Sequence, residues 1–115
     1  MTFRFQADAD LNAKIVRGVQ KREPAIDFRG AAGVIQDSTP DPEVLRVAAD
    51  SGRVLVSGGL KTMRVHFTEF VLHRDSPGVL LVPSTRSIGA AIDGLIIVWL
   101  TWSPEELRNL IRWLP

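Results

Sequence analysis

The chain has 115 residues, no cysteine, and 14 basic against 13 acidic residues, which gives a formal net charge of +1. This length predicts a single domain over residues 1–115, with a core large enough to need no metal or disulfide. The lack of cysteine excludes disulfides, thiolate metal sites and cysteine catalysis, and it fits a reducing compartment. The balanced charge gives no overall attraction to nucleic acid, so only a local basic face could provide one.

The hydropathy pattern indicates a soluble protein. The longest apolar run, residues 95–100, is far shorter than the roughly 20 residues that a membrane-spanning helix needs. Arg4, Asp8 and Asp10 interrupt any apolar stretch at the start, so no signal-peptide pattern is expected. We therefore expect a cytoplasmic protein with no membrane partner.

The first part of the chain predicts a strand followed by a helix. Residues 3–7 alternate apolar and polar side chains, which is typical of a strand that ends at Asp8. Asp10 is the expected N-cap of the helix. The apolar face of that helix comprises Leu11, Ile15, Val16 and Val19.

A short strand and a long loop are expected next. Residues 25–28 suit a second strand, and residues 29–40 are rich in Gly, Ala, Ser, Thr and Pro without any period. A structureless loop of this length suggests a functional lid or a mobile edge.

The central part of the chain reads as a helix, a tight stop and a buried strand. Asp41 can cap the helix, Pro42 suits its first position, and Gly52 supplies a left-handed stop. Residues 54–56 are an aliphatic run too short for a helix, as in a parallel strand covered on both faces. The strand ends in Ser-Gly-Gly at residues 57–59, where the crevice of an open α/β sheet lies.

The remainder predicts three helices and at least one more strand. The first helix carries apolar residues at Leu60, Met63, Phe67, Phe70 and Val71. Residues 78–82 form another buried strand, and residues 88–99 a long amphipathic helix. A Ser cap, a Pro and a Glu within residues 103–106 start the last helix. Residues 111–114 are either its final turn or a closing edge strand.

The order of these elements predicts an α/β fold. Strands that alternate with helices imply a mostly parallel sheet with right-handed crossovers and helices on both faces. We expect a three-layer, Rossmann-like domain with four to five strands.

Three acidic positions are candidates for chemistry. Asp8 stands at the tip of the first strand, where an Mg2+ ion would find an oxygen ligand. The alternative is an aspartate that starts the loop and caps the following helix. Asp10 is more simply explained as a cap. Glu43 lies in the first turn of the second helix, where an acid is favourable to the helix dipole in any case.

Basic and imidazole side chains suggest weaker possibilities. Lys14, Arg17 and Lys21 share one helix face and could follow a phosphate backbone, although a solvated face is the commoner explanation. His66 and His73 are seven residues apart, which matches no standard metal motif.

Several short motifs occur in a recognisable order. They are F-x-A-D-A-x-L at residues 5–11, D-P-E-V-L and G-R-V-L-V within 41–56, K-T-M at 61–63, P-G-V-L-L-V-P at 77–83, I-G-x-A-I at 88–92, and the terminal S-P-E-E and W-L-P. Their order and spacing resemble those of the small stand-alone PIN-like proteins of bacteria, a branch of the PIN nuclease superfamily. The resemblance covers essentially the whole chain.

This resemblance implies an Mg2+- or Mn2+-dependent ribonuclease of the toxin-antitoxin type. The family's first acid matches Asp8 and its helix acid matches Glu43, which makes these two the expected catalytic residues. Asp8, Asp10 and Glu43 are the expected metal ligands. A third acid normally follows the central strand, but Gly59 stands at that position. We therefore expect weak or absent cleavage, unless Asp10 moves into the site.

The alternative is a non-catalytic PIN-fold module that binds protein or RNA. The resemblance implies an antitoxin protein and RNA as partners. Trp99, Trp102 and Trp113 gather near the end of the chain, which leaves a homodimer open.

Overall fold

The computed structural model describes residues 2–59 and 61–115, so Leu60 of the expected third helix lies outside the described residues. Its centre is a parallel sheet in the order β2-β1-β3-β4-β5. The strands are β1 (Arg4–Ala7), β2 (Asp27–Arg29), β3 (Val54–Ser57), β4 (Val79–Leu81) and β5 (Ile111–Trp113). The predicted α/β class is confirmed.

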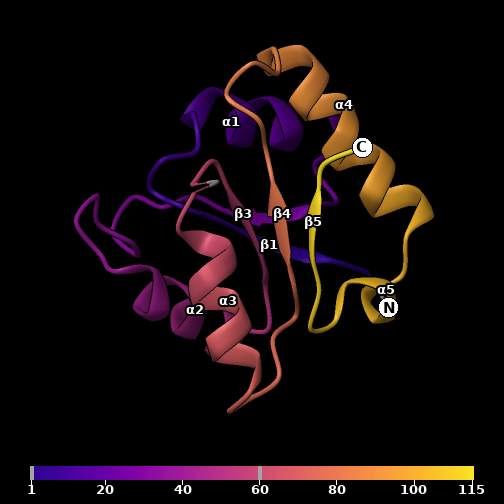
Figure 1. Cartoon of the computed structure of the whole chain (residues 1–115). Coiled ribbons are helices and arrows are strands. Elements are labelled where there is room, and N and C mark those ends of the chain that lie inside the picture. The colour runs from indigo at the N-terminus through magenta and orange to yellow at the C-terminus, as the bar shows by residue number, and fades with distance from the viewer. Residues whose placement is uncertain (1, 60) are drawn as a thin grey trace.

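Helices cover both faces of this sheet (Figure 1). They are α1 (Ala13–Arg22), α2 (Asp41–Asp50), α3 (Met63–Val71), α4 (Ile88–Thr101) and the short α5 (Pro104–Leu107). The pair α1 and α4 packs on one face, and the pair α2 and α3 packs on the other. The result is the three-layer arrangement that the element order predicts. Within the described ranges, no helix is both long and apolar enough to cross a membrane.

The alternation of side chains along β3 divides the core into two clusters. Val54 and Val56 pack against α1 and α4, while Leu55 packs against α2 and α3. All three side chains are buried because both faces of the sheet are covered. This is why the strand appears in the sequence as an unbroken apolar run.

The start of α1 differs from the prediction. Asn12, not Asp10, is the N-cap, and its side chain accepts a hydrogen bond from the backbone N–H of Lys14 at 2.9 Å. A turn closed by the N–H of Leu11 and the carbonyl of Asp8 precedes the helix and delays its start. Asp10 is therefore free to make other contacts.

The start of α2 also differs. Pro40 is its N-cap, and Asp41 is the first helical residue rather than the cap. The predicted left-handed stop is confirmed, since Gly52 follows the helix with φ of 66°.

The irregular segments connect these layers. The second strand begins two residues later than predicted, and residues 30–40 contain no helix or strand. Ile35 is 4% exposed and packs against the α2 and α3 cluster, which anchors this loop. Residues 111–113 form a parallel edge strand beside β4, which decides between the two alternatives left by the sequence.

Candidate functional site at the carboxyl ends of the strands

The parallel strands bring their carboxyl ends to one rim of the sheet. Asp8 is the first residue beyond β1, and its backbone N–H donates to the carbonyl of Val56 on β3 at 2.9 Å. The neighbouring strand β3 ends at Ser57. Asp8 and Ser57 therefore meet at the rim, with residues 58–59 directly after them.

Asp8 is the buried acid of this rim, with 7% of the residue exposed. Its Oδ2 accepts a hydrogen bond from the Ser57 hydroxyl at 2.8 Å, and its Oδ1 accepts one from the N–H of Ala9 at 2.7 Å. Burial raises the pKa of Asp8, the Ser57 hydrogen bond opposes that rise, and the charges of Asp10 and Asp41 add to it. A cation nearby would relieve the cost of ionising this carboxyl.

Asp10 reaches across to the loop after β3. Its Oδ1 accepts a hydrogen bond from the N–H of Gly58 at 3.0 Å. A Cβ atom at Gly59 would lie 3.0 Å from Asp10 Oδ2 and 3.3 Å from Ser57 Oγ. The carboxylate of residue 10 thus lies against the place where a side chain at residue 59 would begin.

Asp41 is the third acid near this rim. It begins α2, and its Oδ2 accepts a hydrogen bond from the hydroxyl of Thr62 at 2.5 Å. Its charge contributes to the raised pKa of Asp8. The sequence indicates a helix cap at Asp41, with a supporting role at the site as the lesser alternative. One sequence feature could have indicated that Asp41 lies near the rim. It is in the first turn of a helix, and the loop before that helix begins at the same rim.

Glu43 lies elsewhere. Arg46 binds its carboxylate with two donors, one of them Nε at 2.9 Å from Oε2, and this pairing lowers the pKa of Glu43. Glu43 lines a hollow between α2 and α3 together with His66 and His73. Asp8 lines a different hollow, on the side of α1. In the part of the chain that the structure describes, the two expected catalytic residues thus line separate hollows.

Helix geometry explains this separation. Successive residues of an α-helix are rotated by about 100°, so residues two apart point roughly 200° away from each other. Because Asp41 faces the rim, Glu43 must face away from it.

The donors at the rim can be tested against a divalent cation. Over residues 2–59 and 61–115, no group of three or more His, Cys, Asp and Glu side chains is placed to hold a metal ion. Each rim aspartate already accepts at least one hydrogen bond, but every carboxylate has further lone pairs. This set fits an Mg2+ or Mn2+ ion that is held by one or two carboxylates and keeps several waters.

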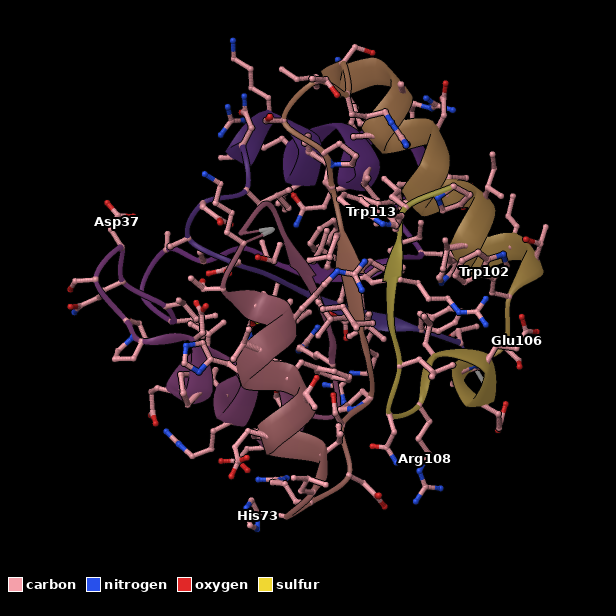
Figure 2. All side chains as sticks on the ribbon, viewed as in Figure 1. Asp37, His73, Trp102, Glu106, Arg108 and Trp113 are labelled. Carbon is pink, nitrogen blue, oxygen red and sulfur yellow. The ribbon has the colours of Figure 1, made fainter. Side chains whose placement is uncertain are left out.

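His73, Trp102 and Trp113, which the sequence also singles out, contact other side chains. Nε2 of His73 lies 3.1 Å from Oε1 of Glu69, at the C-terminal end of α3 (Figure 2). Trp102 and Trp113 lie on the β5 side of the molecule (Figure 2). A guanidinium group lies over each indole ring, at 5.8 Å and 5.5 Å respectively. The contacts of these three side chains are thus with Glu69, Arg112 and Arg64 rather than with the rim aspartates.

Comparison of the chain with protein-family models, with curated proteins and with solved structures found no match. The resemblance to PIN-like proteins therefore stays a prediction from sequence motifs. A parallel α/β fold supports many unrelated activities, so the fold does not identify one. What the chain does must be inferred from the residues at the rim.

Proposed function

We propose that this chain is a PIN-like, metal-dependent ribonuclease with a reduced acidic centre formed by Asp8 and Asp10, close to Asp41. The observation that carries the proposal is the position of the Asp10 carboxylate. It lies beside Gly59, where the resemblance expects an acid that this sequence lacks. An acid from the first loop thus stands near the place of the missing one.

The chain's own groups hold these carboxylates in position. The Ser57 hydroxyl and the Ala9 N–H fix both oxygens of Asp8, and the Gly58 N–H fixes Asp10. A bound Mg2+ or Mn2+ ion would supply an activated water and would stabilise the leaving oxygen. Because a cation binds the ionised carboxylate, activity should rise with pH through the raised pKa of Asp8.

RNA cleavage in the presence of Mn2+ tests this proposal. The wild type is compared with Asp8→Asn, Asp10→Asn and Glu43→Gln, each purified in the same way. We expect both asparagine variants to lose at least tenfold in rate, while Glu43→Gln stays within about twofold of the wild type. Cleavage by Asp8→Asn at the wild-type rate would show that the site is assigned wrongly.

A specific observation also favours a second candidate, a non-catalytic RNA-binding module. Glu43 is paired with Arg46, and Gly59 supplies neither ligand nor charge. Wild-type protein that binds RNA but leaves it intact with Mg2+ and with Mn2+ would support this candidate over the first.

The toxin-antitoxin role rests on the sequence resemblance. Arrest of bacterial growth on expression of the chain, relieved by Asp8→Asn at equal protein level, would support it. Growth arrest that persists unchanged in Asp8→Asn would show that any toxicity does not depend on the acidic rim.

A further inference from the structure

A large hollow lies beside Asp8, between α1 and the loop of residues 30–37. Its volume is about 670 Å3, within the range of roughly 300 to 1,000 Å3 that is typical of small-ligand pockets. Gly30, Ala31, Ala32 and Gly33 form one wall, and Arg17 and Gln20 belong to the other. The small side chains of the loop would let a flat ring approach the backbone closely.

A row of cations runs along α1 next to this hollow. Lys14, Arg17 and Lys21 are exposed, and they take part in none of the ion pairs found among the described residues. Arg22, by contrast, is paired with Asp93 at 2.6 Å. Because these three cations form no ion pair with the described residues, they are available to an anionic ligand.

The row and the hollow are adjacent because of helix periodicity. Residues three and four apart share one side of a helix, which places Lys14, Arg17 and Lys21 on one stripe. Val16 and Gln20 lie on the next stripe and line the hollow, and Arg17 belongs to both. With a rise of about 1.5 Å per residue, the row extends about 10 Å along α1, and Arg17 is the member of the row that lines the hollow.

We propose that single-stranded RNA binds here, with one base in the hollow and the adjoining phosphates along Lys14, Arg17 and Lys21. The choice of RNA rests on the proposed function, but the binding itself requires neither a metal nor cleavage. Phosphates match the unpaired cations, and a neutral base fits a hollow whose lining includes carboxylates.

The acids of the hollow argue against a carboxylate-rich peptide as the ligand. Asp8 and Asp37 both line the hollow. Asp37 belongs to the loop of residues 30–37 and lies at the side of the molecule (Figure 2). An acidic side chain placed in this hollow would meet both like charges. A base carries N–H groups that can donate hydrogen bonds to these carboxylates.

Fluorescence polarisation with a short fluorescein-labelled single-stranded RNA, in EDTA, tests the proposal. Arg17→Glu should weaken binding at least tenfold and reduce the salt dependence of the affinity. Gly30→Leu should also weaken binding at least tenfold without a change of charge, because Gly30 lines the hollow and nothing lies within 4 Å of a Cβ added there. The matched control is Arg112→Glu on β5, at the opposite edge of the sheet from β2, which should stay within about twofold of the wild type.

Three outcomes would overturn the proposal. They are no RNA binding by the wild type, equal losses in Arg112→Glu and Arg17→Glu, or displacement of the RNA by polyglutamate as readily as by unlabelled RNA. Unchanged melting temperatures of the variants would exclude misfolding as the cause of a loss. RNA binding without cleavage would contradict only the proposed ribonuclease activity. If Arg17→Glu and Gly30→Leu both cleave RNA at the wild-type rate, only this binding mode would be contradicted.

Discussion

Asp8 is the residue on which the chemistry of the rim depends. Its carboxyl is buried and hydrogen-bonded, and it lies in the field of two other aspartates. Such a group is costly to ionise in the folded protein, and that cost is typical of functional sites. The same cost makes the residue a sensitive reporter of stability.

We predict that Asp8→Asn stabilises the protein at neutral pH in EDTA. The pKa of Asp8 is raised from 3.8 on folding, so the folded state binds its proton more tightly than the unfolded state. Stability therefore falls as the pH rises from about 3.8 through the raised pKa, by about 1.4 kcal/mol for each unit of the shift.

Thermal unfolding from acid to neutral pH measures this effect. The difference in melting temperature between variant and wild type should shrink as the pH approaches 3.8 from above. A variant whose relative stability does not depend on pH over this range would contradict the raised pKa.

Gly59 offers a second test at the residue scale. A side chain there starts 3.0 Å from Asp10 Oδ2, so Gly59→Asp brings a second carboxylate against the first. We predict that Gly59→Asp alone lowers the melting temperature, whereas the double variant Asp10→Ser with Gly59→Asp recovers it. Calorimetry with Mn2+ should show that the double variant binds at least as tightly as the wild type. A single variant as stable as the wild type would mean that the two positions do not share this space.

At the scale of elements, the site depends on the orientation of α2 where the helix follows the loop of residues 30–40. The first residue of the helix, Asp41, points to the rim and is held by Thr62 at the start of α3. The burial of Val44, Leu45 and Ala48 fixes the rotation of the helix about its axis. Glu43 is thereby directed to Arg46 and to the outer hollow.

The junction between β4 and α5 predicts a clear effect on stability. Gly78 has φ of 115°, and a Cβ there would lie 2.3 Å from the carbonyl oxygen of Leu107. Gly78→Ala should therefore destabilise the fold by about 1–3 kcal/mol or more, through backbone strain and this clash.

Gly89 provides the matched control for that substitution. It lies in the first turn of α4, and nothing comes within 4 Å of an added Cβ. Gly89→Ala should be neutral or stabilising by up to about 1 kcal/mol. Urea unfolding of both variants measures the pair, and equal stabilities would contradict the packing of α5 against β4.

At the scale of the whole molecule, the layers were predictable from sequence. The aliphatic run at residues 54–56 indicates a strand with both faces covered, and the apolar periodicity of α1 and α4 indicates helices on a sheet. The positions of Asp8 and Ser57 at one rim also follow, because parallel strands end on the same side. These inferences need only local patterns and one topological rule.

The partners of each acid were not predictable in this way. Asp41 and Glu43 point in different directions from α2, and their partners differ: Asp41 meets Thr62, which is distant in sequence, whereas Glu43 meets Arg46. Asp10 reaches Gly58 only because Asn12 caps α1 in its place. Sequence spacing does not report such side-chain directions.

The most direct test of the acidic rim is the paramagnetic effect of Mn2+ on the amide NMR signals of the protein. Substoichiometric Mn2+ should broaden the signals of Ala9, Gly58 and Gly59 first, since their N–H groups bond to the rim carboxylates or to Ser57. Asp8→Asn should abolish this broadening. If the first signals to broaden are instead those of Arg46 and His66, which flank Glu43, the cation binds in the outer hollow and the rim aspartates are not its ligands.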